Sequence, residues 1–270
     1  MKRVGENATH SSSGAHPVAA QLLVDPPQSG PWNMAVDQAL LEAAASAESI
    51  VVRCYQWSRP TLSLGYFQKL ADRSQHRASA SAALVRRASG GGAILHDHEL
   101  TYSLAIPASH ARGGPLAAAI RDTGLLYRAV HTSLIRVLGG LGVSARLCEA
   151  AEADAGRDQP FLCFERRSAG DVLCAGFKIA GSAQRRYRGA ILQHGSILLQ
   201  RSEAAPELPG IADLTGVELS AAGLAHLWLP DLSEALGLEC RPVELDPALR
   251  LRAAEWEAGR FGATEWTALK

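Results

Sequence analysis

Residues 171–199 read DVLCAGFKIAGSAQRRYRGAILQHGSILL. This stretch contains three strand-like runs, 171–175, 178–184 and 190–199, which are joined by Gly176 and by residues 186–189. Joints this short are typical of hairpins, in which neighbouring strands run antiparallel. The stretch therefore predicts an antiparallel sheet at the centre of the fold.

Helices and further strands are predicted on both sides of this sheet. Apolar residues keep helical spacing over 31–43 and 124–141. Short runs rich in β-branched or aromatic residues predict strands at 50–55 and 61–66, which we expect to form a hairpin, and at 83–87, 92–96 and 100–106. The segment 220–268 is predicted to be helical. We expect an α+β fold, a mostly antiparallel β-sheet flanked by helices.

Length and composition favour one catalytic-size domain over residues 18–270, preceded by a disordered lead-in at 1–17. The chain has 270 residues, of which 47% are hydrophobic and 20% are charged. Its 27 basic and 27 acidic residues balance, and no basic block predicts binding to nucleic acid or to a membrane surface. Neither an apolar span nor a signal peptide is present in the sequence, so we expect a cytoplasmic protein.

Five cysteines lie far apart in the sequence without a CxxC pair, which predicts reduced thiols. Cys163 is the best candidate for a nucleophile, because it lies in a loop-like stretch followed by Arg166 and Arg167, whose charge would favour a thiolate. Cys54 and Cys174 fit apolar strands, where packing explains them. A lone cysteine such as Cys163 is nevertheless more often a buried structural residue.

Three other features are open to two interpretations. Gly90, Gly91 and Gly92 join two predicted strands, and their N–H groups could hold a carbonyl, carboxylate or phosphate, although a flexible hairpin is equally consistent. Lys178 lies early in a strand of small residues, where a surface lysine is the commoner case. His194 lies inside an apolar strand and could orient a ligand or be a satisfied core histidine.

Taken together, these motifs resemble the biotin/lipoate protein ligase catalytic family. The resemblance rests on NMAVD at 33–37, LSLGYFQ at 62–68, the Arg-rich glycine loop at 86–97, KIAGSAQ at 178–184 and QHGS at 193–196, which occur in family order. It is closest to the LipM-type octanoyltransferases, which have a Cys-Phe pair fifteen residues before the lysine. Gln38 and the segment 165–167 depart from the family pattern.

The resemblance implies a function as well as a fold. It implies transfer of an octanoyl group from acyl carrier protein, through a thioester on Cys163 with Lys178 as partner, to a lysine of a lipoyl-domain protein such as glycine cleavage H protein, in protein lipoylation. No cofactor or metal is implied. The implied substrate-binding residues are Arg87, Ser89, Gly90, Gly91, Gly92, His96, Gly181, Ser182, Ala183, His194 and Gly195.

Three other functions are compatible with parts of the pattern. An ATP-dependent lipoate–protein ligase would use the glycine loop and Lys178 to hold an acyl-adenylate. An octanoyl-protein amidotransferase would move the acyl group between two lipoyl domains by the same Cys–Lys chemistry. A non-enzymatic module that binds a lipoyl domain or a fatty acid would keep the pocket without turnover.

Overall fold

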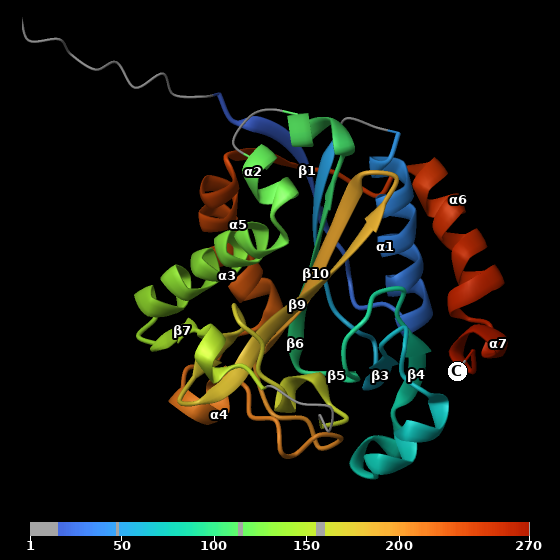
Figure 1. The fold of residues 1–270 in the computed structure, drawn as a ribbon, viewed down its shortest axis with the longest axis vertical. Helices are drawn as coiled ribbons and strands as arrows, with labels where there is room; N and C mark the ends of the chain where they lie inside the picture. The colour runs from blue at the N-terminus through green and yellow to red at the C-terminus, as the bar shows by residue number, and fades with distance from the viewer. Residues whose placement is uncertain (1–15, 47–48, 113–115, 155–159, 270) are drawn as a thin grey trace, which may run out of the picture.

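The computed structural model describes residues 16–46, 49–112, 116–154 and 160–269 (Figure 1). Most of the predicted lead-in, residues 1–17, therefore lies outside the described residues. The strands are β1 (Val18–Val24), β2 (Ile50–Tyr55), β3 (Thr61–Leu64), β4 (Ala83–Arg86), β5 (Ile94–His96), β6 (Glu99–Ile106), β7 (Ala145–Leu147), β8 (Val172–Cys174), β9 (Phe177–Tyr187), β10 (Ala190–Leu198) and β11 (Leu238–Pro242). The helices are α1 (Gly30–Ala44), α2 (Leu116–Arg121), α3 (Thr123–Gly140), α4 (Ile211–Thr215), α5 (Ala221–Leu236), α6 (Pro247–Trp256) and α7 (Thr264–Thr267).

The larger sheet has eight strands in the order β11-β1-β2-β6-β10-β9-β8-β7, and a smaller sheet has the order β4-β3-β5. From β2 to β7 all neighbours are antiparallel, whereas β1 runs parallel to both β2 and β11. The prediction of a mostly antiparallel α+β fold is therefore confirmed. Within the described residues, no helix is long and apolar enough to cross a membrane.

Two tight turns build the centre of this sheet as the sequence predicts. Ala175 and Gly176 join β8 to β9 with φ values of 47° and 84°, and Arg188 and Gly189 join β9 to β10 with 48° and 89°. Two successive residues with positive φ form the hairpin turn whose twist matches that of the strands it joins. The second turn sets the register of β9 and β10, which pairs His194 with Ala183.

The predicted hairpin of residues 50–55 and 61–66 is wrong. β2 inserts between β1 and β6 in the larger sheet, and β3 pairs with β4 and β5 in the smaller one. The reason lies in the connecting segment, where Trp57 pairs with Gln28 and donates its indole N–H to Thr101 Oγ1 at 2.8 Å. Leu62 and Leu64 of β3 are then buried in a separate core with Phe161 and Leu162.

The prediction that residues 220–268 are entirely helical is also wrong, because β11 interrupts the helices. Gly237 ends α5 in the left-handed region, with φ of 63°, and turns the chain into β11. This strand pairs with β1 from Leu238 opposite Val18 to Pro242 opposite Leu22. The strand has only five residues, LECRP, and contains no β-branched or aromatic residue, which is why its sequence does not predict a strand.

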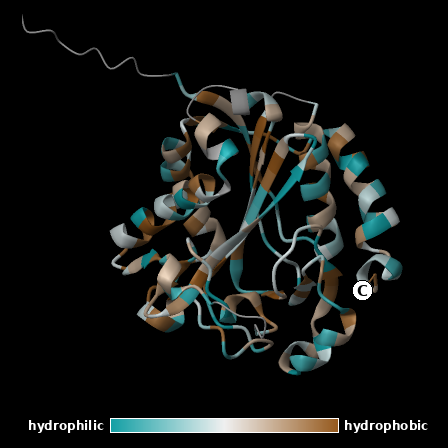
Figure 2. Ribbon diagram, viewed as in Figure 1, coloured by the Kyte–Doolittle hydropathy of each residue, from teal (hydrophilic) through white to brown (hydrophobic). Residues whose placement is uncertain are grey.

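Helices cover both faces of the larger sheet (Figure 1). α3 and α5 bury Leu134 and Trp228 against one face of the larger sheet. On the opposite face, α1 and α6 bury Leu40 and Ala253 in a second core that includes Val51 of β2. Hydrophobic and hydrophilic residues alternate along α6 (Figure 2), where Leu251 is exposed. Burial of these faces drives the packing.

The buried carboxylate of Asp37 fastens α1 to the sheet. It accepts hydrogen bonds from Arg53 at 2.8 Å and Tyr55 at 3.0 Å on β2, from Ser103 at 2.8 Å on β6, and from His194 at 3.2 Å on β10. Arg53 is itself fully buried and also pairs with Asp25 at 2.7 Å. One carboxylate thus joins a helix to three strands.

We expect Asp37→Asn to lower the free energy of unfolding by about 3 kcal/mol at pH 7, because it leaves Arg53 short of a buried anion. Burial by itself raises the pKa of Asp37, but the His194 hydrogen bond and the Arg53 charge lower it below its ordinary value. The native-state pKa is therefore depressed, so the stabilisation is present above about pH 4 and is lost as the pH falls through that pKa.

Urea unfolding at pH 7, 5 and 3 measures this effect. The difference between wild type and Asp37→Asn should shrink at pH 3, while Asp231→Asn, at a surface ion pair with Arg136, should cost little at any of these pH values. A cost for Asp37→Asn that is the same at all three pH values would contradict this role of the carboxylate.

Candidate active site

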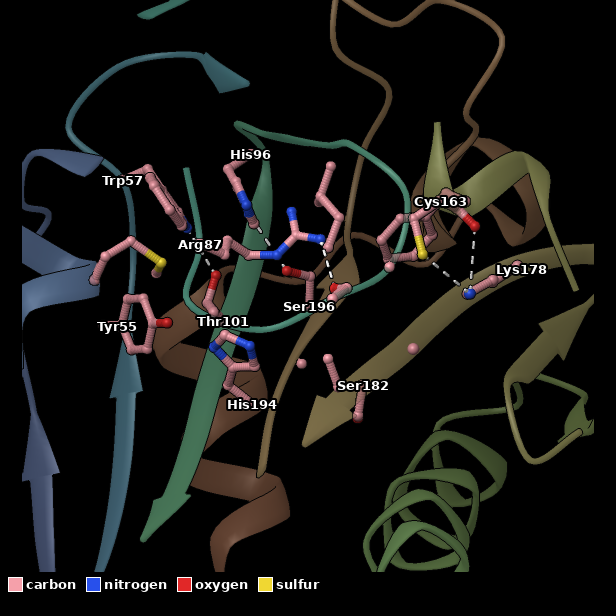
Figure 3. A pocket seen from close by; sticks show the side chains of 18 residues that line it. Tyr55, Trp57, Arg87, His96, Thr101, Cys163, Lys178, Ser182, His194 and Ser196 are labelled. Carbon is pink, nitrogen blue, oxygen red and sulfur yellow. Dashed lines mark hydrogen bonds between the residues drawn. The ribbon is translucent and has the colours of Figure 1, made fainter. Parts of the chain in front are cut away.

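Cys163 and Lys178 point toward one another at one end of a pocket (Figure 3). The Lys178 ammonium nitrogen Nζ lies 3.8 Å from the Cys163 sulfur Sγ and 3.4 Å from the Cys163 carbonyl oxygen. Cys163 begins a 3₁₀ turn, Cys163–Glu165, and Lys178 lies near the start of β9. A cation at this distance favours the thiolate form of a cysteine.

The glycine loop holds Cys163 in place. The Cys163 N–H donates to the Ala93 carbonyl at 2.7 Å, and the Ala93 N–H donates to the Phe161 carbonyl at 3.0 Å. Ala93 and Leu162 thereby form a short parallel bridge, and both are completely buried. The end of the loop and the cysteine segment consequently form one unit, although some seventy residues separate them in the sequence.

Lys178 has a second partner, Asp171, which sequence reasoning missed. Their charged groups approach to 2.8 Å, and the two side chains are only 4% and 5% exposed. Burial by itself would lower the pKa of Lys178, but the neighbouring Cys163 and Asp171 outweigh it and raise that pKa above its ordinary value. Lys178 is therefore cationic at neutral pH. The tight turn at Gly176 could have indicated this contact in the sequence, because it brings residue 171 back beside β9.

Two residues of the glycine loop, Gly90 and Gly91, line the pocket. Gly91 has a φ of 97°, which favours glycine, and a Cβ at Gly65 would lie 2.0 Å from the Gly91 carbonyl oxygen. Within the described part of the chain, the N–H groups of Gly90, Gly91 and Gly92 donate to no protein acceptor. The loop joins β4 to β5, which are not neighbours in the smaller sheet, so the hairpin alternative is wrong.

Arg87 binds the backbone of this loop. Its guanidinium donates to the carbonyls of Ser63 at 2.6 Å, Gly92 at 2.8 Å and Gly90 at 3.2 Å. The residue is 2% exposed, and burial lowers its pKa to about 10. Arg87 thus binds the carbonyls on both sides of Gly91 and holds the loop backbone in one conformation.

His194 connects the same loop to Asp37. The Asp37 carboxylate accepts from His194 Nδ1, so Nδ1 carries a proton, and the opposite nitrogen Nε2 lies 2.6 Å from the Ser89 hydroxyl oxygen. In the neutral ring, Nε2 accepts a hydrogen bond from the Ser89 hydroxyl. His194 is thus both a hydrogen-bonded interior residue and part of the pocket wall.

The far end of the pocket is closed by an aromatic stack. The Trp57 and His96 rings lie 3.8 Å apart and nearly parallel. Glu99 accepts from His96 at 2.6 Å and from Ser196 at 3.0 Å, which holds the imidazole in place. Burial lowers the pKa of His96. This end therefore presents a flat ring surface, in contrast to the cationic end at Lys178.

The Ser182 hydroxyl is occupied by protein partners. It lies 2.5 Å from the Tyr102 hydroxyl and 2.7 Å from His131 Nε2, and the Tyr127 hydroxyl donates to the Ser182 carbonyl at 2.6 Å. A Cβ at Gly195 would lie 2.5 Å from Ser182 Oγ, so glycine is needed there. Sequence reasoning missed His131 and Tyr127, because nothing in the helical pattern of α3 distinguishes them.

The structure brings nearly all the predicted site residues around this one pocket. Ser89 and Gly92 lie in its loop without lining it, and the substrate contacts of the whole set stay predictions. Arg166 and Arg167 donate to the carbonyls of Pro160 and Gly176, so the cation placed against the sulfur is Lys178. The predicted residues that line the pocket are Arg87, Gly90, Gly91, His96, Cys163, Lys178, Gly181, Ser182, Ala183, His194 and Gly195.

Known proteins resemble this chain in sequence, and solved structures resemble it in fold. The family described as the lipoyl protein ligase A/B catalytic domain matches residues 29–205. An octanoyltransferase LipM of Kyrpidia tusciae is 33% identical over 265 residues, spanning 88% of this chain and 94% of the relative. One of Carboxydothermus hydrogenoformans is 37% identical, spanning 88% and 94%.

Solved structures agree at the level of the fold. A lipoate-protein ligase A bound with ATP superposes with a TM-score of 0.73 at 20% identity, covering 93% of this chain and 99% of that structure. A bipartite lipoate protein ligase from Thermoplasma acidophilum superposes with a TM-score of 0.69, also at 20% identity, covering 94% and 98%. The arrangement of sheets and helices is therefore common to these proteins.

Gly181→Ala should move the Lys178 ammonium away from Cys163 without unfolding the protein. A Cβ there would lie 2.5 Å from Lys178 Cε and 3.1 Å from Asp171 Oδ1, and the lysine end is the flexible partner. Because the thiolate would lose its cation, we expect iodoacetamide to alkylate Cys163 several-fold more slowly at pH 7. Gly139→Ala, at a helical position with open space, should keep the wild-type rate. An unchanged rate in Gly181→Ala would argue against this contact.

Proposed function

We propose that this chain, which belongs to the lipoyl protein ligase A/B catalytic domain family, is an octanoyltransferase that carries the acyl group on Cys163. The acceptor is a lysine of a lipoyl-domain protein, and the donor is octanoyl-acyl carrier protein. The observation that carries the proposal is the 3.8 Å approach of Lys178 Nζ to the Cys163 sulfur at the end of a pocket. A free catalytic thiol suits a reducing compartment, so we place the reaction in the cytoplasm.

In the first half-reaction the Cys163 thiolate attacks the thioester carbonyl of the donor. A carbon–sulfur bond to Cys163 forms, the bond to the carrier sulfur breaks, and the carrier thiolate takes a proton from solvent. The oxyanion that forms in between is stabilised by Lys178 and by the free N–H groups of the glycine loop. Each such donor contributes about 3–4 kcal/mol in measured systems.

In the second half-reaction the neutral amine of the acceptor lysine attacks the Cys163 thioester. A carbon–nitrogen bond forms, the carbon–sulfur bond breaks with its electrons returning to Cys163, and the nitrogen releases its extra proton to solvent. The thioester is already activated for acyl transfer, so the reaction needs no ATP. The same oxyanion donors serve both halves.

The acyl chain binds in the pocket next to Cys163. Besides the Trp57–His96 stack, the apolar side chains of Met34, Ile94 and Phe164 line the pocket. Burial of about six methylenes contributes roughly 5 kcal/mol, at about 0.8 kcal/mol each. The closed far end limits the chain length that fits.

One experiment separates this function from the two other acyl-transfer reactions. The protein and a lipoyl-domain acceptor are incubated with octanoyl-acyl carrier protein without ATP, with octanoate and ATP, or with an octanoylated lipoyl-domain protein. We expect the first donor to label the acceptor fastest. Faster labelling from octanoate with ATP would establish a ligase, and faster labelling from the octanoylated protein would establish an amidotransferase.

Cys163→Ser should abolish octanoyl transfer, because a serine hydroxyl beside Lys178 is not ionised near neutral pH. The measurement is the mass of the acceptor after incubation with octanoyl-acyl carrier protein. The matched control is Cys174→Ser, since Cys174 lies 3% exposed in β8 and burial raises its pKa. Full transfer by Cys163→Ser would refute the thioester mechanism, and loss of transfer in a folded Cys174→Ser would reassign the nucleophile.

A further inference from the structure

The Lys178 ammonium is shared among three acceptor atoms from two residues, Asp171 and Cys163. Asp171 Oδ2 lies 2.8 Å from Nζ, closer than the Cys163 carbonyl at 3.4 Å or the sulfur at 3.8 Å. The three N–H bonds of an ammonium match these three acceptors. The Phe164 ring centroid lies 5.4 Å away on a further side. Lys178 is thus enclosed rather than extended into solvent.

Asp171 is held rigidly for this contact. Its Oδ2 also accepts the Ser168 N–H at 2.7 Å, and its carbonyl accepts the Cys148 N–H at 2.7 Å. The preceding residue, Gly170, has a φ of 92° and accepts a hydrogen bond from His131 Nδ1 of α3 at 2.6 Å. Backbone and helix contacts therefore fix the carboxylate before any substrate arrives.

A buried ammonium needs such an anion. Removing water from a lysine favours its neutral form, and an adjacent carboxylate favours the charged one. The other titratable groups around this site supply no second permanent anion, since burial lowers the pKa of His131 and raises those of Tyr127 and Cys148. The groups that face Lys178 or its two partners are Asp171, Cys163, His131, Tyr127, Cys148 and Arg87.

We propose that Asp171 is a positioning residue that keeps Lys178 protonated and directed at Cys163 throughout the reaction. Lys178 then acts as a fixed positive charge and hydrogen-bond donor, and it does not take the proton of the acceptor lysine, which goes to solvent. This inference rests on the proposed function for its catalytic meaning. Its physical content, an anion that maintains the charge beside Cys163, is independent of the acyl donor.

The direction in which the Cys163 titration moves when Asp171 is replaced distinguishes this role from a direct effect of the carboxylate on the thiol. A negative charge near a thiol raises the thiol pKa, so simply removing Asp171 would lower it. If removing Asp171 also neutralises Lys178, the thiolate loses its cation, and its titration moves to higher pH. An upward shift therefore arises only through Lys178.

The experiment measures the rate of iodoacetamide alkylation of Cys163 between pH 6 and pH 9.5 in the full-length protein. Asp171→Asn should raise the midpoint of the pH profile by about one unit or more, toward that of Lys178→Met. In the Lys178→Met background, the same Asp171→Asn change should leave the midpoint unchanged or lower it. Arg87 is present in every variant, so its own titration does not distinguish them.

Two further variants separate positioning from folding. Asp171→Glu keeps the charge and should restore most of the wild-type profile, whereas Asp231→Asn, at the surface pair with Arg136, should not alter it. Thermal melting identifies any variant that fails to fold. If Asp171→Asn does not fold, Asp171→Glu carries the test, and its midpoint should lie slightly above that of wild type and well below that of Lys178→Met. A lowered or unchanged midpoint in folded Asp171→Asn, or an upward shift that persists without Lys178, would overturn the proposal.

Alkylation needs no acyl donor, so its result stands apart from the proposed function. If wild type transfers octanoate from none of the three donors, the octanoyltransferase assignment fails while the alkylation profile still reports on Asp171. If transfer occurs, the rate of octanoyl-enzyme formation should fall in Asp171→Asn with little change in KM. A change confined to KM would show that Asp171 acts on donor binding instead.

Discussion

The carboxylate of Asp37 is the interaction on which the architecture of the site depends. It is buried and accepts hydrogen bonds from β2, β6 and β10, so it ties the helix that carries it to three strands of the sheet. Through His194 it also fixes the Ser89 hydroxyl at the start of the glycine loop. The end of that loop pairs with the backbone of Cys163. Hydrogen bonds at the two ends of the loop, joined by the loop backbone, thus connect the first helix to the proposed nucleophile.

The pocket has two chemically different ends, and this difference explains how it serves acyl transfer. At one end the cationic Lys178 lies beside Cys163. At the other, the stacked rings of Trp57 and His96 provide a surface without free charge. An acyl chain with a reactive carbonyl has the same division, so its orientation follows from the polarity of the walls.

The sequence predicts the centre of the fold well because its signals are local there. The tight turns at Gly176 and Gly189 and the apolar runs beside them specify β8, β9 and β10 without reference to distant residues. The parallel edge could not be predicted in this way, since β11 pairs with a strand more than two hundred residues away and is mostly exposed. The false hairpin between β2 and β3 has the same origin, because the partner of Trp57 is the distant Gln28.

Some residues of the site can be predicted from sequence motifs, whereas others are identified only by their contacts in the folded chain. Cys163, Lys178 and the glycine loop are recognisable together from the family resemblance, although each has an ordinary explanation alone. Asp171 belongs to no such motif, and its importance appears only when the turn at Gly176 and the shift in register near Val172 bring it against a buried lysine. Tertiary contact, rather than residue type, distinguishes it from other acidic residues of the chain.

The most direct test of the account is to locate the acyl group on the protein itself. Wild type is mixed briefly with octanoyl-acyl carrier protein, digested at low pH and analysed by tandem mass spectrometry. The account predicts an octanoyl group on the peptide that contains Cys163, removable by hydroxylamine as a thioester. An octanoyl group on another residue, or transfer to a lipoyl-domain protein with no covalent intermediate on the enzyme at any time, would contradict it.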